Sequence, residues 1–139
     1  MFILRMAVRF GWIAALLWGS WALAQNDPPR YIRPILKIDE HSNGQTVTAK
    51  KLDGLELLLP ENPTTGYSWN LKSSGEPVCK LENTVYESPS QRIGQGGRRM
   101  WLFKVVEPGQ ATIELAYQRP FERGKPPATT FKVTIRANR

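Results

Sequence analysis

The side chains that could carry out nucleophilic catalysis are few and stand far apart in the sequence. The one histidine, His41, lies in the polar stretch Asp39–Gln45, and the one cysteine, Cys79, lies in the strand-like run Val78–Leu81. A Ser-His or Cys-His site needs the imidazole beside the nucleophile, and nothing near His41 predicts that contact. Zinc would lack ligands as well. The sequence therefore predicts no catalytic residue of this kind, no metal site and no cofactor.

A pair of carboxylates is the remaining catalytic arrangement, because two such groups across a cleft can hydrolyse a glycosidic bond. Glu61, Glu87 and Glu122 all lie in or beside polar loops. Glutamates in such places are usually solvated surface residues. We therefore expect that the chain is not an enzyme.

Three polar segments combine turn-forming residues with residues suited to recognition. They are Asn62-Pro63-Thr64-Thr65-Gly66-Tyr67, then Gly94-Gln95-Gly96-Gly97 followed by Arg98, and finally Arg119-Pro120-Phe121. Pro63 fixes φ and Gly66 can adopt a positive φ, so the first loop should have a defined shape with its two threonine hydroxyls facing outward. A turn of this type is also an ordinary connector of strands. A rigid polar tip nevertheless suits binding.

The elements that carry these loops read as β-strands. Apolar residues alternate with other residues in five segments, and weaker strands are expected at Tyr31–Ile38, Thr46–Lys50 and Val78–Tyr86. Period-two alternation places one face of a strand in the core and the other in water, which favours antiparallel sheets. Short strands separated by Gly, Pro, Asn and Ser predict a sandwich or a barrel. The five clearest sets are Leu55/Leu57/Leu59, Tyr67/Trp69/Leu71, Trp101/Phe103/Val105, Ile113/Leu115/Tyr117 and Phe131/Val133/Ile135.

The connections between the expected strands differ in length. Counted from Thr46–Lys50, the second, fourth and sixth are the long ones, and they carry the three segments described above; they are Pro60–Gly66, Glu87–Arg98 and Gln118–Ala128. In a sandwich, alternate connections emerge at the same end. One end of the domain is therefore expected to be elaborated for binding while the other is trimmed.

Together and in this order, the three segments resemble the recognition loops of the chagasin family of cysteine peptidase inhibitors. The family's NPTTG-aromatic, GxGG and RPW-like motifs match Asn62–Tyr67, Gly94–Gly97 and Arg119–Phe121, and the resemblance spans roughly Thr46 to Arg136. It departs at Phe121, where the family most often has Trp. Phenylalanine keeps the flat apolar face and loses the indole N–H donor.

The resemblance implies an all-β, immunoglobulin-like antiparallel β-sandwich and a reversible, non-covalent inhibitor of papain-like cysteine peptidases. In that reading the first loop enters the catalytic cleft, with Thr64 and Thr65 nearest the catalytic Cys-His region, and Tyr67 packs at the loop base. Gly96 and Gly97 let backbone approach the enzyme, with Gln95 and Arg98 framing them. Arg119 hydrogen-bonds or stacks, Pro120 stiffens the loop, and Phe121 is the apolar anchor.

A carbohydrate-binding or adhesive β-sandwich module is the alternative function, because exported sandwiches often use aromatic residues to stack on sugars. Trp69 and Trp101 are the candidates, yet both lie in register with alternating apolar residues, which predicts core positions. Phe121 follows a proline on a polar loop, out of strand register, where an exposed aromatic indicates contact with a partner. The lone Cys79 is expected to be a buried structural residue without a disulfide partner.

The N-terminus has the features of a secretory signal peptide in residues 1–24. Arg5 and Arg9 precede or open an apolar run that ends at Ala22-Leu23-Ala24, a small-residue cleavage signal, and this run is shorter than a bilayer span. We expect residues 25–45 to be an N-terminal extension leading into an inhibitor domain at residues 46–139. The protein should be periplasmic or secreted, without a stable membrane anchor after cleavage.

The charge balance does not predict a nucleic-acid partner. Loss of Arg5 and Arg9 with the leader lowers the formal net charge from +7 to +5, and the remaining basic residues are spread along the chain. No nucleic-acid-binding module is recognisable, and export also argues against that role. The partners expected are papain-like cysteine peptidases, bound by a monomer.

Overall fold

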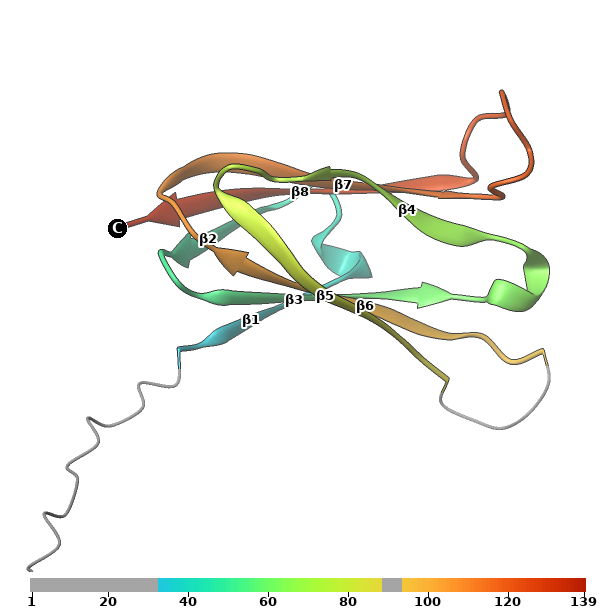
Figure 1. Cartoon of the computed structure of the whole chain (residues 1–139), viewed down its shortest axis with the longest axis horizontal. Helices are drawn as coiled ribbons and strands as arrows, with labels where there is room; N and C mark the ends of the chain where they lie inside the picture. The colour runs from blue at the N-terminus through green and yellow to red at the C-terminus, as the bar shows by residue number, and fades with distance from the viewer. Residues whose placement is uncertain (1–32, 89–93) are drawn as a thin grey trace, which may run out of the picture. The chain divides into compact units, whose positions relative to one another are not determined.

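The computed structural model describes residues 33–88 and 94–139, and within them the chain forms eight strands and two short 3-10 helices (Figure 1). The signal peptide expected at residues 1–24 lies outside the described residues. No helix in the described part is long and apolar enough to cross a membrane. The elements are β1 (Ile35–Asp39), η1 (Glu40–Ser42), β2 (Thr46–Lys50), β3 (Gly54–Glu61), η2 (Pro63–Thr65), β4 (Ser68–Ser74), β5 (Cys79–Glu87), β6 (Gly97–Val105), β7 (Gly109–Gln118) and β8 (Thr129–Asn138).

The strands form two four-stranded sheets that pack face to face, so the predicted all-β sandwich is confirmed. One sheet has the order β1-β3-β6-β5 and the other the order β2-β8-β7-β4. The sheets are mixed and not antiparallel throughout, because β1 pairs parallel to β3 and β2 pairs parallel to β8. This follows from the chain path: β2 lies in the other sheet, so the chain returns to β3 in the direction that it had in β1.

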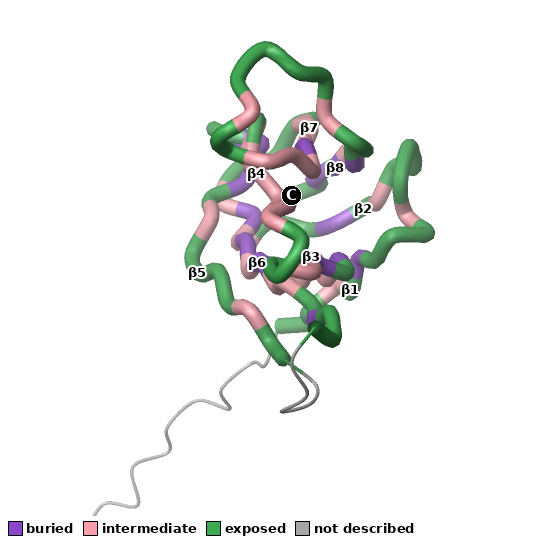
Figure 2. Tube along the Cα trace, turned by 90° about the vertical axis from the view of Figure 1, so that its right-hand side faces the viewer, coloured by how far each residue is buried: buried purple, intermediate pink, exposed green. Residues whose placement is uncertain are grey.

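The core lies between the two sheets and is built by the alternating apolar residues of the central strands. Leu57 faces the core opposite Trp101, and Leu115 does so opposite Phe131. Cys79 is also fully buried, as expected. Figure 2 shows these buried stretches behind the exposed loops. Burial of such side chains contributes roughly 25 cal/mol per Å² of apolar surface removed from water.

The sandwich begins earlier than the boundary expected at residue 46. β1 comes from the segment assigned to an N-terminal extension, and its residues pair with β3 from Ile35↔Gly54 to Asp39↔Leu58. Its Ile38 side chain is 1% exposed and belongs to the core. The domain therefore includes residues 35–45, because β1 pairs with β3 along its whole length and contributes Ile38 to the core.

Long and short connections fall at opposite ends of the strands, as the sequence predicts. The β3–β4, β5–β6 and β7–β8 connections span residues 62–67, 88–96 and 119–128, whereas those between β2 and β3, β4 and β5, and β6 and β7 have three or four residues. The described parts of the three long connections lie at the end away from the C-terminus (Figure 1). We call them the first, glycine and third loops.

Candidate functional site

The first loop is a closed turn held by its own first residue. Asn62 precedes η2, and its Oδ1 accepts hydrogen bonds from the Thr64 amide at 3.2 Å and the Thr64 hydroxyl at 2.6 Å. Pro63 opens the helical turn, where its missing N–H is not needed. Gly66 ends it with a φ of 78°, and its amide donates to the Pro63 carbonyl. The loop shape expected from Pro63 and Gly66 is therefore present without a partner.

The two threonines differ from the expectation in how their hydroxyls are used. Both residues are exposed, but each hydroxyl donates its proton inside the loop, Thr64 to Asn62 Oδ1 and Thr65 to the Asn62 carbonyl at 2.7 Å. The prediction that these hydroxyl groups face outward is therefore wrong, because the O–H donor of each is used within the loop. A short hydroxyl side chain next to a turn competes readily for nearby backbone acceptors. Both threonines nevertheless remain exposed at the tip of the loop.

A buried ion pair supports the base of the first loop. Glu61 is 2% exposed, and Arg99 donates to it from Nε at 2.8 and 2.9 Å and from Nη2 at 2.6 Å. The same carboxylate accepts from the Trp69 amide at 3.2 Å. The hydrogen bonds to Glu61 raise the pKa of Arg99 from its ordinary value, against the opposing effect of burial. The pair thus joins the end of β3 to the starts of β4 and β6.

Glu61 corrects the expectation that the glutamates beside the loops are solvated. The signal that could have identified it is the alternation Leu55, Leu57, Leu59, which continues to position 61 on the inward face. A buried carboxylate requires a charged partner, and Arg99 stands opposite Leu59 on β6, one step along the same face.

Tyr117 at the end of β7 is a second support that sequence reasoning placed in the core and not in the site. Its hydroxyl accepts from the Asn62 amide at 3.1 Å. Its ring lies 5.4 Å from that of Tyr67 and 4.9 Å from that of Trp69. Tyr67 therefore packs at the loop base as expected. Trp69 is only partly buried at the rim of the core, where its Nε1 donates to the Pro60 carbonyl.

The glycine loop touches the first loop through Asn62. Part of this loop, residues 89–93, lies outside the described residues. The Asn62 Nδ2 group donates to the Gly94 carbonyl at 3.5 Å, and a Cβ on Gly96 would stand 3.3 Å from the Asn62 Cβ. Gly94, Gln95 and Gly96 are exposed. A side chain at position 96 would therefore press on the first loop.

Gly97 and Arg98 lie differently from the expectation. Gly97 is buried, and a Cβ there would fall 2.2 Å from the Glu87 carbonyl, so glycine is needed for packing against β5 and not for approach to a partner. Arg98 forms an ion pair with Glu40 of η1 at 3.7 Å and lines a hollow with residues of β1 and β3. Its contacts are therefore with η1, β1 and β3, and not with the tip of the glycine loop.

The third loop also contacts the first loop directly. Arg119 donates from Nε to the Thr65 carbonyl at 3.2 Å, and its guanidinium lies 4.5 Å from the centre of the Tyr67 ring. Phe121 is 71% exposed, and a Cβ on Gly66 would be 3.3 and 3.4 Å from two of its ring atoms. The ring of Phe121 thus stands beside the turn of the first loop, and most of its surface faces solvent.

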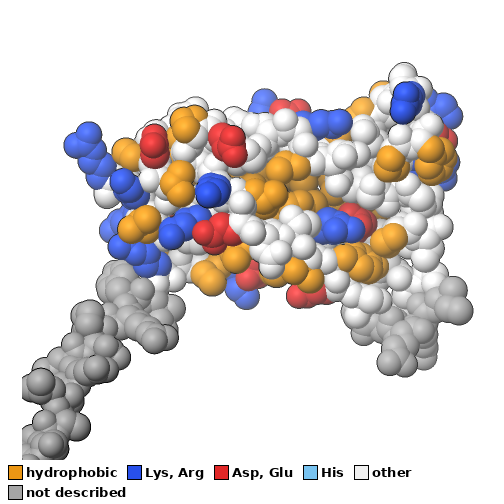
Figure 3. Space-filling view, viewed as in Figure 1, with side chains coloured by type: hydrophobic (Ala, Val, Ile, Leu, Met, Phe, Trp, Pro, Cys, Tyr) orange, Lys and Arg blue, Asp and Glu red, His pale blue; other side chains and the backbone are white. Residues whose placement is uncertain are grey.

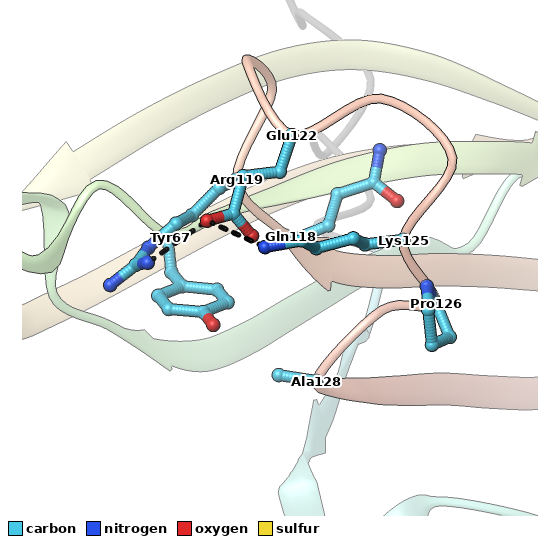
Figure 4. A pocket seen from close by; sticks show the side chains of 7 residues that line it. All are labelled: Tyr67, Gln118, Arg119, Glu122, Lys125, Pro126 and Ala128. Atoms are coloured by element: carbon cyan, nitrogen blue, oxygen red, sulfur yellow. Dashed lines mark hydrogen bonds and ion pairs between the residues drawn. The ribbon is translucent and has the colours of Figure 1, made fainter.

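The charges of the third loop are organised around Glu122. Its carboxylate accepts from Arg119 at 3.2 Å and lies 3.5 Å from the Lys125 ammonium (Figure 4). The hydrogen bond from Arg119, aided by Lys125, lowers the pKa of Glu122 below its ordinary value. Arg123 and Lys125 are exposed, and the space-filling view shows Lys and Arg side chains at this corner of the molecule (Figure 3). The tip of this loop therefore presents positive charge.

The described residues offer no arrangement for catalysis or metal binding. No group of three or more metal-ligating side chains occurs among residues 33–88 and 94–139. Burial raises the pKa of the Cys79 thiol to about 11, which keeps it protonated and unreactive at neutral pH. His41 is exposed on η1 and Cys79 is enclosed in the core. Among the described residues, the one cysteine and the one histidine therefore do not form a nucleophile–base pair.

Comparison with known proteins identifies the family. The family model described as chagasin family peptidase inhibitor I42 matches residues 48–135. Chagasin of Trypanosoma cruzi is 30% identical over 107 residues, which cover 73% of this chain and 97% of that protein. Amoebiasin-1 of Entamoeba histolytica is 32% identical over 108 residues, covering 74% of this chain and 98% of the relative.

Solved structures agree with the sequence comparisons. A cysteine protease inhibitor from Entamoeba histolytica superposes with a TM-score of 0.68 at 27% identity, covering 75% of this chain and 96% of that one. The solution structure of amebosin gives a TM-score of 0.61 at 30% identity, with 76% and 99% covered. A family model that spans more than half of the sequence, together with relatives matched over nearly their whole length, shows that this chain belongs to the chagasin family of peptidase inhibitors.

Proposed function

We propose that this protein is a reversible, non-covalent inhibitor of papain-like cysteine peptidases, which it blocks with three loops at one end of a β-sandwich. The observation that carries the proposal is the direct contact among these loops, through Asn62 to Gly94 and through Arg119 to Thr65. Three loops fixed to each other lose little conformational freedom on binding. Family membership supports the inhibitory role, since the family consists of peptidase inhibitors and not of enzymes.

The closed turn of the first loop explains how the protein can fill a peptidase cleft without being cut. Peptidases cleave substrates whose scissile carbonyl is aligned with the nucleophile and the oxyanion donors. Here the amides of Thr64, Thr65 and Gly66 all donate within the turn. Opening the turn into an extended strand would break these hydrogen bonds. The loop therefore occupies the cleft in a shape that does not lead to cleavage.

The proposed binding surface combines a polar tip with one apolar anchor. Thr64 and Thr65 are the exposed tip of the first loop, and Gly94 to Gly96 are the exposed part of the glycine loop. Phe121 supplies the anchor, because a large exposed aromatic beside rigid loops is typical of an interface hot spot. The full set proposed for the binding end is Asn62, Pro63, Thr64, Thr65, Gly66, Tyr67, Gly94, Gln95, Gly96, Gly97, Arg98, Arg119, Pro120 and Phe121. Some of these residues, including Gly97 and Tyr67, act by packing or positioning and not by contact with the peptidase.

A sugar-binding role finds little support in the aromatic residues. Trp101 is buried, and Trp69 lies partly covered against Tyr117 with its indole N–H already donated to Pro60. Among the described residues, Phe121 is the one aromatic side chain that is mainly exposed. A single ring does not make the extended stacking platform that a glycan needs.

We further propose that the protein acts as a monomer in the periplasm or outside the cell. The motif of charged start, apolar run and Ala22-Leu23-Ala24 supports removal of residues 1–24 during export. The mature chain would then begin at Gln25, after removal of the apolar run. A target peptidase that meets it must work in the same compartment.

The test is titration of papain with the purified chain from Gln25 to Arg139. We expect stoichiometric loss of papain activity and no inhibition of trypsin. Phe121→Ala should weaken inhibition of papain by about 1–3 kcal/mol without lowering the melting temperature. Ile35→Ala is the matched control, because Ile35 is also an exposed apolar residue but lies on β1, at the end away from the loops. Equal inhibition of trypsin would contradict the proposal. Binding to glycans together with no loss of papain activity would also contradict it.

A further inference from the structure

We infer that Arg119 and Glu122 form an internal strut that holds the first loop in its binding shape, so that Arg119 acts on a peptidase through Thr65 and not by direct contact. This inference rests on the proposed function of the three loops. It assigns the arginine of the third loop a positioning role. The apolar anchor of the same loop, Phe121, keeps the contact role.

Two of the three guanidinium nitrogens of Arg119 and one face of the group are already engaged within the protein. Its Nε donates to the Thr65 carbonyl, one Nη donates to Glu122, and one face of the guanidinium lies over the Tyr67 ring. About 35% of its side chain remains exposed, compared with 71% exposure for the nearby Phe121. A planar guanidinium can make these three contacts at once because its donors are fixed in one plane. Figure 4 shows Arg119 with two of these contacts, Tyr67 and Glu122.

Glu122 fixes the guanidinium from the other side. The Glu122 amide donates to the Arg119 carbonyl at 3.1 Å, which closes a turn and brings the two side chains to the same side. The carboxylate also lies 3.5 Å from Lys125, and together with Tyr67 and Gln118 these residues line a hollow of about 310 Å³. Arg119 and Glu122 thus form part of the wall of this hollow. Arg119 is thus held by Glu122 at one end and holds Thr65 at the other.

The position of Thr65 makes this contact important for the first loop. Its carbonyl lies between the tip of the loop and Gly66, whose φ of 78° sets the return of the chain. The Thr65 hydroxyl accepts from the Tyr67 amide at 3.4 Å, and the Tyr67 ring is the surface on which Arg119 stacks. Arg119 therefore contacts both the backbone and the side-chain base of the turn. Loss of the strut should release the turn into several conformations.

A strut and a direct contact have different kinetic consequences. If the turn is in its binding shape for only a fraction of the time, the apparent dissociation constant rises by the inverse of that fraction. The loss then appears as slower association, since only the correctly shaped fraction binds, and the dissociation rate stays the same. Removal of a direct contact mainly speeds dissociation.

The first test measures amide hydrogen exchange in the free protein by NMR. We expect Arg119→Ala to speed exchange of the Thr64, Thr65, Gly66 and Tyr67 amides by about tenfold, as for loss of a hydrogen bond to a charged donor. Glu122→Gln should speed the same amides to a lesser degree and should add nothing in the Arg119→Ala background. Lys125→Ala is the matched control, because it removes the other cation on Glu122, and it should leave these amides unchanged.

The second test measures binding of the same variants to papain. Arg119→Ala should slow association by the factor by which the population of the binding-shaped turn falls, and leave the dissociation rate near that of the unaltered protein. Unchanged exchange in Arg119→Ala, or faster dissociation with unchanged association, would overturn the strut. Failure of the unaltered protein to inhibit papain would instead count against the proposed function, and the exchange measurement on the free protein would still decide the strut.

Discussion

Asn62 joins more of the binding end than any other residue of the first loop. Its side chain caps η2 through Oδ1 and reaches the Gly94 carbonyl through Nδ2, while its amide donates to Tyr117. An amide side chain suits this position, because its oxygen accepts from the amide of the turn while its NH₂ group donates to the Gly94 carbonyl. Aspartate could cap the turn but could not donate to Gly94.

Gly66 allows a test of whether the shape of the first loop matters for inhibition. An L side chain in the left-handed region costs about 1–2 kcal/mol, so Gly66→Ala and Gly44→Ala, both at φ of 78°, should lower stability alike. Inhibition should weaken only in Gly66→Ala, since its Cβ would press on Phe121 whereas Gly44 has nothing within 4 Å. Inhibition constants and melting temperatures of the two variants check this. A similar loss of inhibition in both would mean that the contact with Phe121 is unimportant.

Cys79 should affect stability at high pH and not inhibition. Its pKa is raised by burial from 9.0 to about 11, so the unfolded chain ionises first as pH rises. The stability that the thiol provides is then complete below pH 9 and is lost progressively between pH 9 and 11, by about 2–3 kcal/mol in total.

Denaturant unfolding of the original protein and Cys79→Ala at pH 7, 9 and 10.5 measures this effect. The stability advantage of the original protein over the variant should shrink across that series. A constant difference would show that the thiol is not enclosed. Both proteins should inhibit papain equally, because Cys79 lies in the core and not in a loop.

Several features of the site follow from residue types, and others depend on neighbours that the sequence does not identify. Pro63 and Gly66 predict a fixed turn because their backbone preferences are local, and Phe121 predicts exposure because it falls outside the strand register. The predictions that the two threonine hydroxyls face outward and that Glu61 is solvated are wrong. Both outcomes depend on which acceptor or cation lies nearby in three dimensions.

At the scale of elements, β1 is a part of the sandwich that contributes to its stability, and not only a segment leading into it. It completes the sheet next to β3 and adds Ile38 to the core. Ile38→Ala should lower the free energy of unfolding by about 2–4 kcal/mol. Ile35→Ala should change it by less than about 0.5 kcal/mol, because Ile35 is 52% exposed on the same strand. Equal effects in denaturant unfolding would show that β1 does not belong to the sandwich.

The ends of β3, β4 and β6 depend on the ion pair of Glu61 with Arg99. Arg99→Ala leaves a buried carboxylate without its cation and should cost about 3–5 kcal/mol in the free energy of unfolding. Arg98→Ala, one residue away, removes a half-exposed pair with Glu40 and should cost at most about 1 kcal/mol. Chemical unfolding of both variants measures the difference. A small effect of Arg99→Ala would mean that Glu61 finds water or another donor.

The strands themselves are predicted well by alternation, but their pairing is not. Leu55 to Leu59, Trp101 to Val105 and Phe131 to Ile135 all lie in strands with the expected inward face. Alternation reports which side of a strand is buried and contains nothing about the direction of its neighbour. The parallel pairs β1–β3 and β2–β8 therefore could not be predicted in this way.

At the scale of the whole domain, the division between long and short connections determines where binding can occur. The long loops all leave the ends of strands whose other ends are joined by three or four residues. A stiff sandwich beneath three loops in mutual contact makes a surface that needs little rearrangement to bind. The sequence predicts this end from loop lengths and motif order, while the contacts among the loops required the structure.

The central claim is that inhibition results from shape and not from reaction, and binding to an inactive peptidase tests it most directly. Papain whose catalytic cysteine is replaced by alanine should bind the inhibitor in calorimetry with about the same affinity as the active enzyme. Mass spectrometry after prolonged contact with active papain should find the inhibitor whole, uncut between Thr64 and Thr65. Failure of the alanine enzyme to bind, or a covalent adduct with the active one, would contradict the account.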